Sequence, residues 1–495
     1  GAGKLRLIEL MGNNVSQLAD REITGLTADS RLVEPGYLFA ALPSSVADSA
    51  MNGADFVPEA IRRGAAALLG PPGLAAMLDI APDHDIDVPI IEDEEPRRRL
   101  SQLAARFFAG QPKTIVAVTG TSGKSSVADF VRQIWIAMGR SGASLGTLGV
   151  NSGPVQRKLA HTTPDPVILH EALRDLADAG VNHLALEASS HGLEQRRLDW
   201  VKVLVAAFTN LSRDHLDYHA DAEAYLQAKL HLFNVVMAPG GTAVLPASSD
   251  LTERLRDVCR ARKHKVLTFG AGGDVDLLRR EMVGHGQRLT ISVKSRQAVL
   301  DLPLIGAFQA ENVLCAIALV LACGEDPDTV LAAAVHLIGV PGRLQTVAGP
   351  ADKGGVFVDY AHKPEALRAA ITALRPHTKG QLVVVFGCGG DRDRGKRPLM
   401  GRIAADLADK VIVTDDNPRG EIPDAIRAEI LADCPGGIEI GDRGQAIAAA
   451  IGPLGPDDVL LIAGKGHETG QTISGVTHPF DDGQVAARIL AGGVP

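Results

Sequence analysis

Residues 115–126 are Ile115-Val116-Ala117-Val118-Thr119-Gly120-Thr121-Ser122-Gly123-Lys124-Ser125-Ser126. An apolar run that ends in a glycine-rich turn is typical of a buried parallel strand leading into a helix. The backbone N–H groups of such a turn, together with the helix N-terminus, face an anion. The stretch therefore predicts a phosphate-binding loop in which Lys124 reaches the phosphates and Ser125 ligates Mg²⁺. A simple glycine turn with an exposed lysine is the alternative, because Val118 stands where the general template has a glycine.

The segments that follow this loop repeat the alternation of strand and helix. Apolar runs at Leu184–Leu186 and Leu204–Thr209 indicate buried strands, and Leu169–Ala179 has helical periodicity. Glu187 directly follows the first of these runs, so it is expected at the carboxyl edge of a parallel sheet, where α/β folds bind ligands. A carboxylate there can bind Mg²⁺ beside the phosphates.

Both flanks of this region have α/β patterns of their own. Short apolar runs at 37–42, 65–69 and 88–91 surround an amphipathic helix at Phe56–Arg63, and a charged helix is expected at 94–109. Beyond a helix at Ala310–Cys323 and a break at Pro341-Gly342, buried strands are predicted at 356–358, 382–386, 411–413 and 459–462. The 495 residues are too many for one core, so we predict an α/β protein of three domains, 1–96, 97–340 and 341–495.

Composition excludes several classes of function. The 50 basic and 59 acidic residues give a net charge of -9, and the absence of a basic run argues against nucleic-acid binding. Five cysteines without a CxxC pair argue against a disulfide framework or a structural zinc site, and they fit the reducing cytoplasm. No apolar stretch approaches the roughly 18 residues that span a bilayer, so membrane insertion is not expected. Residues 1–3, Gly-Ala-Gly, have the composition of a cloning remnant.

Further motifs follow the loop in order along most of the chain. They are Thr162-Thr163-Pro164, Glu187-Ala188-Ser189-Ser190-His191-Gly192, Asn210-Leu211-Ser212-Arg213-Asp214-His215-Leu216-Asp217, Asp359-Tyr360-Ala361-His362, Gly389-Gly390-Asp391-Arg392-Asp393, Asp416-Asn417-Pro418-Arg419 and Gly464-Lys465-Gly466-His467-Glu468. Together with Thr119–Ser125 they resemble the Mur ligase family, with serines in place of the asparagine and second threonine of the family loop. The resemblance implies a small N-terminal α/β domain, a central ATPase domain of the phosphate-loop type with a mostly parallel sheet, and a Rossmann-like C-terminal domain.

The resemblance also implies an ATP and Mg²⁺ site. Its catalytic residues would be Lys124, Glu187, His215, Lys229 and Arg343, with Ser125, Glu187, His215 and a carbamylated Lys229 (N6-carboxylysine) as metal ligands. ATP would contact Gly120, Thr121, Ser122, Gly123, Lys124, Ser125, Ser126, Asn312, Asp359 and His362. Taken without the resemblance, His215 is a structural histidine and Lys229 a solvated helix lysine.

Two further sets of residues match substrate-binding positions of the family. Those matching contacts to a UDP-linked muramoyl peptide are Ser30, Thr162, Thr163, Ser189, Gln195 and Arg197. Those matching a diaminopimelate pocket are Arg392, Asp416, Asn417, Pro418, Arg419, Gly464 and Glu468. Arginines suit the carboxylates of such a ligand and Glu468 suits its ammonium. Without the resemblance, Thr162 and Thr163 are turn hydroxyls, and Arg419 caps its loop or pairs with Glu421.

The resemblance implies an ATP-dependent ligase that makes an amide bond through an acyl phosphate in the cytoplasm. The expected substrates are ATP, a UDP-linked muramoyl dipeptide and meso-diaminopimelate, and the expected state is a monomer. Catalysis would consist of positioning and charge neutralisation by Lys124, the metals and Arg343. A folylpolyglutamate synthase-like ligase, a lysine-adding Mur ligase and a non-catalytic nucleotide-binding scaffold are the alternatives.

Overall fold

The computed structural model describes residues 3–12, 20–44, 52–79, 88–210, 222–249, 251–284 and 286–494. Their contacts divide the chain into two compact units, Gly1–Val275 with Cys315–Val330, and Asp276–Leu314 with Leu331–Pro495. Helices α10 (Ala307–Ala322) and α11 (Pro327–Ala334) each contain a boundary between the units. In the described part of the chain, no helix is long and apolar enough to cross a bilayer.

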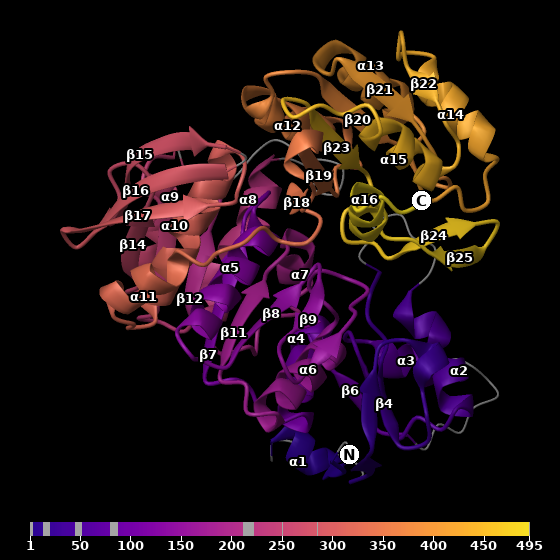
Figure 1. The fold of residues 1–495 in the computed structure, drawn as a ribbon. Helices are drawn as coiled ribbons and strands as arrows, with labels where there is room; N and C mark the ends of the chain where they lie inside the picture. The colour runs from indigo at the N-terminus through magenta and orange to yellow at the C-terminus, as the bar shows by residue number, and fades with distance from the viewer. Residues whose placement is uncertain are drawn as a thin grey trace. The chain divides into compact units, whose positions relative to one another are not determined.

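The first unit begins with a small parallel sheet. Strands β3 (Gly25–Thr27), β4 (Tyr37–Ala40), β5 (Ala67–Gly70) and β6 (Ile90–Glu92) pair in chain order, all parallel. Helix α4 (Pro96–Phe107) packs with one face of this sheet, while α2 (Val57–Arg62) and α3 (Leu74–Asp79) pack with the other. The short elements β1 (Leu5–Arg6), α1 (Leu7–Met11) and β2 (Glu22–Ile23) precede it, in indigo in Figure 1. The expected small α/β domain is therefore present.

A larger sheet forms the centre of the first unit. Its parallel strands, in spatial order, are β8 (Gly142–Gly146), β11 (His183–Glu187), β7 (Thr114–Thr119), β12 (Val203–Phe208), β13 (Thr242–Pro246) and β14 (Lys265–Phe269). Strands β9 (Gly149–Asn151) and β10 (Gln156–Arg157) extend the β8 edge in antiparallel pairing. The helices of this region are α5 (Lys124–Ala137), α6 (Pro166–Asp178), α7 (Ser190–Glu194), α8 (Ala222–His231) and α9 (Thr252–Ala261).

The second unit contains a six-stranded sheet covered on both faces. Its order is β18 (Gln345–Val347), β19 (Gly355–Asp359), β23 (Val459–Ala463), β20 (Leu382–Phe386), β21 (Lys410–Val413) and β22 (Ile438–Glu439), parallel except for β18. Helices α12 (Pro364–Leu374), α13 (Lys396–Leu407) and α14 (Pro423–Leu431) bury their apolar side chains on one face, and α15 (Arg443–Ile451) and α16 (Asp482–Leu490) on the other (Figure 1). This is the doubly wound arrangement expected of a Rossmann-like domain.

Two antiparallel elements of the second unit were not predicted. One is the pair of β16 (Gly286–Val293) and β17 (Arg296–Leu302), which follows β15 (Val275–Val283) in the sheet order, and β15 pairs in parallel with β14. The other is the hairpin of β24 (Gly470–Ile473) and β25 (Val476–Pro479). The predicted strands and the helix at Ala310–Cys323 are confirmed within a few residues at their ends. The predicted helix Phe56–Arg63 begins one residue later, because Gly53–Phe56 is a 3₁₀ turn. The domain boundaries at 96/97 and 340/341 stay predictions.

Candidate functional site

The phosphate-loop stretch forms the predicted strand, turn and helix. Strand β7 ends at Thr119, and α5 begins at Lys124 after a turn in which Gly120 has φ 144° and Gly123 has φ 85°. A Cβ on Gly120 would collide with the hydroxyl of Thr209, so this position requires glycine. Asn210 closes the turn from the neighbouring strand end, because its Oδ1 accepts a 3.0 Å hydrogen bond from the Ser122 N–H.

Two lysines converge on the carbonyl oxygen of Gly120. Lys124 Nζ donates to it at 2.8 Å and Lys229 Nζ at 2.9 Å. Lys229 is only 1% exposed, so the interpretation as a solvated helix lysine is wrong. Burial, and secondarily the charge of Lys124, lower the pKa of Lys229 to about 6. A largely neutral amine therefore lies beside the turn at neutral pH.

Glu187 occupies the carboxyl end of β11, as its position in the sequence predicts. Its buried carboxylate accepts hydrogen bonds from Ser125 Oγ at 3.0 Å and from the Thr147 N–H at 2.9 Å. A Cβ on Gly146 would collide with this carboxylate, so glycine leaves the space that Glu187 fills. Adjacent hydroxyl and carboxylate oxygens are ligands that Mg²⁺ prefers, and the residues present fit that ion.

The rest of the predicted metal set lies partly beyond what can be described. His215 falls within residues 211–221, outside the described residues. Among the described residues no group of three or more His, Cys, Asp and Glu could hold a metal. The predicted set differs from such a group, since it combines Ser125, one carboxylate, a modified lysine and His215. These metal assignments stay predictions.

Apart from Ser30, the residues matched to the muramoyl peptide form one hydrogen-bonded group next to Glu187. Thr163 Oγ1 donates to the Glu187 carbonyl at 2.8 Å and accepts from the Ser189 N–H at 3.0 Å. Arg197 Nη1 donates to the Thr163 carbonyl at 2.6 Å. The Thr162 hydroxyl lies 2.9 Å from the Thr147 hydroxyl. The sequence-distant residues 162–163 and 187–197 are therefore brought together.

Some of these side chains also have structural partners. Ser189 caps α7, because its Oγ accepts from the Gly192 N–H at 3.1 Å. Gln195 Oε1 accepts from Arg197 Nη2 at 2.9 Å and from Arg97 Nη1 at 3.3 Å. Arg97, on α4, had no sequence motif to indicate it. Its other terminal nitrogen donates to the carbonyl of Pro43, which ties the group to the loop that follows β4.

Ser30 lies in the first unit, away from these motifs in sequence. It begins a 3₁₀ turn, Ser30–Leu32, and is buried, and Asp29 caps the turn by accepting from the Arg31 N–H at 3.0 Å. Of the neighbouring stretch 44–53, residues 45–51 lie outside the described residues. The uridine contact of Ser30 stays a prediction.

In the second unit, Asp359 organises the segment that carries Arg343. Its carboxylate accepts hydrogen bonds from the Leu344 and Ala361 N–H groups, both at 2.8 Å. Burial raises the pKa of Asp359, and these backbone hydrogen bonds oppose that rise. The Arg343 guanidinium lies 5.3 Å from the centre of the Tyr360 ring, a cation–π distance.

His362 and Asn312 are the remaining residues matched to ATP. The centre of the His362 ring lies 4.5 Å from that of Tyr360, with the two rings tilted by 56°, and burial lowers the pKa of His362. Asn312 is buried in α10, where its Nδ2 donates to Gln309 Oε1 at 3.0 Å. Arg343, Asp359, His362 and Asn312 belong to the second unit, whereas the phosphate loop belongs to the first. Their contacts with ATP stay predictions.

Most of the residues matched to diaminopimelate follow two strands of the second unit, β21 and β23, which lie on either side of β20. Asp416 to Arg419 follow β21, and Gly464 to Glu468 follow β23. Asn417 Nδ2 donates to Glu468 Oε2 at 2.9 Å, so the two segments meet. Gly464 has φ 116°, and a Cβ there would lie 2.7 Å from Asp416 Oδ2.

The unpredicted β24–β25 hairpin holds the loop that contains Arg419. The Arg419 N–H donates to the Thr472 carbonyl at 3.0 Å, and the Arg419 carbonyl accepts from the Ser474 N–H at 2.7 Å. Arg419 Nη1 donates to the Gly390 carbonyl at 2.8 Å. Arg392 is exposed, one residue after Asp391, whose carboxylate accepts from the Gly420 N–H at 3.0 Å.

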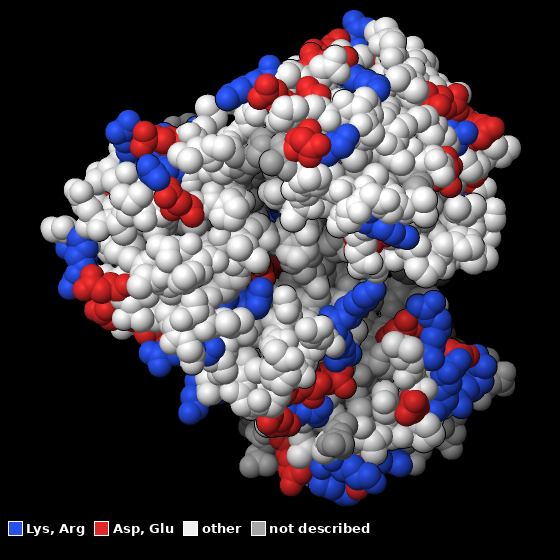
Figure 2. Space-filling model, viewed as in Figure 1, with Lys and Arg blue, Asp and Glu red and all other residues white. Residues whose placement is uncertain are grey.

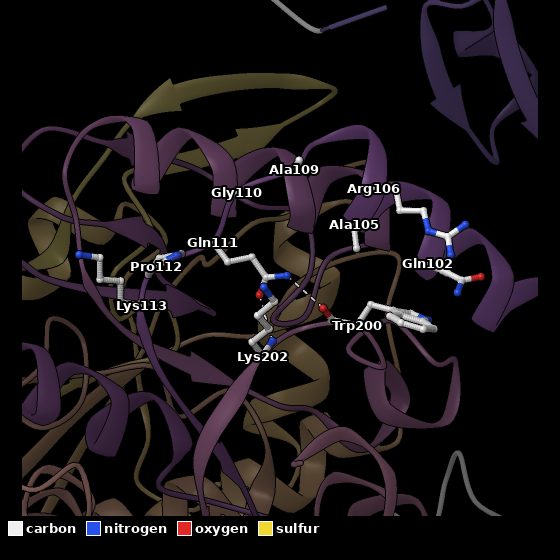
Figure 3. Close-up of a pocket in the computed structure, with 10 residues that line it drawn as sticks. All are labelled: Gln102, Ala105, Arg106, Ala109, Gly110, Gln111, Pro112, Lys113, Trp200 and Lys202. Carbon is white, nitrogen blue, oxygen red and sulfur yellow. Dashed lines mark hydrogen bonds between the residues drawn. The ribbon is translucent and has the colours of Figure 1, made fainter. Parts of the chain in front are cut away.

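A cavity of about 510 Å³ lies at the amino ends of strands β7 and β12 of the large sheet (Figure 3). Its lining comes from the end of α4, from residues 109–113 before β7 and from Trp200 and Lys202 before β12. These residues precede the strands, whereas the phosphate loop and Asn210 follow them. Gln111 Nε2 donates across it to the Trp200 carbonyl at 3.0 Å. Among the described residues this cavity is therefore separate from the predicted chemistry.

Charged side chains of both signs lie on the visible face. Lysine and arginine side chains alternate with aspartate and glutamate side chains over the visible face in Figure 2. Exposed ion pairs of the chain include Arg254 with Glu223 and Arg288 with Asp301, both at 2.6 Å. No broad basic surface is visible on this face.

Comparison with known proteins gives matches along most of the chain. Residues 22–108 match the model described as "Mur ligase family, catalytic domain", residues 118–320 "Mur ligase middle domain" and residues 342–466 "Mur ligase, glutamate ligase domain". A protein of Bradyrhizobium diazoefficiens named UDP-N-acetylmuramoyl-L-alanyl-D-glutamate–2,6-diaminopimelate ligase is 49% identical, over 98% of this chain and 99% of the relative. A Rhizobium meliloti protein of the same name is 46% identical, over 99% of this chain and 100% of the relative.

A solved structure described by the same ligase name covers 99% of both chains with 32% identity and a TM-score of 0.71. The three matched segments correspond to the N-terminal sheet, the large parallel sheet and the doubly wound sheet described above. Fold, ordered motifs and full-length relatives agree, and the chain belongs to the Mur ligase family.

Proposed function

We propose that this chain is an ATP-dependent ligase that adds meso-2,6-diaminopimelate to UDP-N-acetylmuramoyl-L-alanyl-D-glutamate. The observation that carries the proposal is the shared name of relatives that match nearly the whole chain at 46–49% identity. The local geometry supports the same chemistry, because a phosphate-type turn, a buried carboxylate and a buried lysine lie together at the carboxyl edge of the large sheet.

The reaction would begin with transfer of the terminal phosphoryl group of ATP to the γ-carboxylate of the D-glutamyl residue. The N–H groups at the start of α5 and the Lys124 ammonium would bind and orient the phosphates. Mg²⁺, when bound, would neutralise phosphate charge. Ser125, Glu187, His215 and carbamylated Lys229 are the residues proposed to hold it. Asn312, Asp359, His362 and Arg343 are proposed contacts of the nucleotide.

The acyl phosphate would then be attacked by the amine of the incoming amino acid, which releases phosphate and forms the amide. Ser30, Thr162, Thr163, Ser189, Gln195 and Arg197 are proposed to hold the UDP-linked acceptor. Arg392, Asp416, Asn417, Pro418, Arg419, Gly464 and Glu468 are proposed to hold diaminopimelate. The arginines match its carboxylates, and Glu468 matches an ammonium.

A substrate panel tests the proposal. Purified protein, ATP, Mg²⁺ and the UDP-linked dipeptide are combined with meso-diaminopimelate, L-lysine or glutamate in turn, and phosphate release and product mass are measured. We expect product with meso-diaminopimelate. Product with lysine alone would favour the lysine-adding alternative. If none of the three amino acids gives phosphate release, the proposed activity is overturned.

The proposal also gives the reaction a cellular setting. It belongs to peptidoglycan precursor synthesis in the cytoplasm, on which cell-wall biogenesis, cell shape and cell division depend. We propose a monomer that acts on small-molecule substrates.

A further inference from the structure

Lys465 lies between the residues proposed to bind diaminopimelate, although it matches none of the assigned positions. Its side chain is completely buried. Its Nζ lies 3.2 Å from Asn417 Oδ1, 3.3 Å from Glu468 Oε2 and 3.9 Å from Asp416 Oδ1. One ammonium therefore reaches three side chains on two different loops.

These contacts fix the orientation of the Asn417 amide. Asn417 Oδ1 accepts from both Lys465 Nζ and the Thr472 N–H, the latter at 2.9 Å. Because an amide oxygen faces these two donors, the Nδ2 group must point the other way, where it donates to Glu468 Oε2. Lys465 and Asn417 thus both donate to the same carboxylate oxygen.

The other carboxylate oxygen of Glu468 is left for a ligand. Among the described residues no hydrogen bond reaches Glu468 Oε1, and the side chain is 33% exposed. Glu468 is therefore held at one oxygen and presents the second toward an accessible space. An ammonium group is the natural partner for such an oxygen.

We infer that Lys465 is a positioning residue for the amino-acid substrate, holding Glu468 and Asn417 so that Glu468 Oε1 receives the substrate ammonium. This inference rests on the proposed function. The competing role is structural, in which Lys465 only compensates the buried charge of Asp416.

The test replaces Lys465 by methionine, which keeps the length of the side chain and removes its charge and donors. We expect the KM for meso-diaminopimelate to rise about 10- to 100-fold, as for loss of hydrogen bonds to a charged group, with the KM for ATP changed less than about threefold. Lys353→Met is the matched control, since Lys353 is half-buried and donates to the Gly452 carbonyl. Equal changes in all kinetic constants would overturn the inference.

A double-mutant cycle separates positioning from structural support. If Lys465 acts through Glu468, Lys465→Met should have little further effect on the KM for meso-diaminopimelate in a Glu468→Gln background. If the two substitutions raise this KM independently, so that their factors multiply in the double variant, the positioning role is refuted. Should Lys465→Met fail to fold, Asp416→Asn/Lys465→Met is compared with Asp416→Asn alone, so that both proteins lack the buried Asp416 carboxyl. The KM of the double variant is expected to exceed that of Asp416→Asn, and equal values would also refute the inference.

Failure of the inference is distinguishable from failure of the proposed function. The wild-type enzyme is first run through the substrate panel, which identifies the amino acid without reference to Lys465. If another amino acid is used, the KM is measured for that one. An active wild type with an unaffected Lys465→Met variant refutes only the positioning role.

Discussion

Replacing Lys229 by alanine should stop ligation and leave an enzyme that a short carboxylate partly reactivates. The structure gives the reason, because the Lys229 amine is buried within 2.9 Å of the Gly120 carbonyl, which also accepts from Lys124. A second ammonium at this point would oppose metal binding. A neutral amine can instead react with CO₂ to form a carbamate, whose anionic oxygens suit Mg²⁺.

The lowered pKa of Lys229 determines how much of its amine is neutral and can react with CO₂. With the pKa lowered to about 6, roughly thirty neutral amines exist for each ammonium at about pH 7.5. An ordinary lysine, with a pKa near 10.4, has roughly one neutral amine in a thousand at that pH. Burial therefore raises the reactive fraction roughly a thousandfold. Loss of the resulting ligand should reduce turnover at least about 100-fold.

The assay combines turnover with detection of the carbamate. Phosphate release by Lys229→Ala is measured with and without added formate, acetate or propionate, and Lys353→Ala serves as the control for loss of a half-buried lysine in the second unit. In parallel, wild-type protein is incubated with ¹³C-bicarbonate and its NMR spectrum is searched for a carbamate carbon that Lys229→Ala lacks. A fully active wild type without that signal would refute the reasoning.

Three further predictions concern other parts of the chain. Lys124→Ala should lower turnover at least about 100-fold with an unchanged circular dichroism spectrum, and near-normal turnover would contradict the phosphate role. Arg419→Ala should raise the KM for meso-diaminopimelate about 100-fold with the KM for ATP unchanged, and retained preference over lysine would show that another residue selects the substrate. His170 is buried, and its Nε2 has no hydrogen-bond partner among the described residues. Its burial lowers the pKa to about 4, so between about pH 4 and 6.5 the unfolded chain binds more protons and stability rises with pH. His170→Leu should remove about 3 kcal/mol of that rise in the free energy of unfolding, measured by urea unfolding at several pH values. If wild type and variant show the same pH dependence of unfolding free energy, the prediction is wrong.

The sequence predicted best where function and fold share one contiguous stretch. The strand, turn and helix from Ile115 onward follow from apolar residues, glycines and a helix start that lie next to each other. The positions of Glu187 and Asp359 at strand ends, and of Asp416 shortly after β21, could also be predicted from the sequence. The reason is that parallel strands bring their carboxyl ends to the same edge of their sheet. Antiparallel additions such as β24–β25 gave a weaker signal, since their exposed strands lack a continuous apolar run.

Residues that act through distant contacts were not predictable in the same way. Arg97 reaches Gln195 from 98 positions away, and Lys465 reaches Asn417 from 48 positions away. Neither contact has a local pattern, because each depends on how separate loops meet after folding. Lys229 shows the limit most clearly, since its helix position suggested solvent exposure while tertiary packing buried it beside the turn.

Arg419 illustrates why sequence neighbours are poor guides to ion pairs at such a site. Glu421, two residues away, was the partner considered in the alternative to substrate binding, but its carboxylate is paired with the buried Arg397 at 2.8 Å. Arg419 has φ 53° and is tied by its backbone to the β24–β25 hairpin, so its side chain is directed to the Gly390 carbonyl instead. In the part of the chain that the structure describes, Arg419 forms no ion pair. A half-buried guanidinium whose positive charge is not balanced by an acid retains its attraction for a carboxylate, which is the group that distinguishes diaminopimelate from lysine.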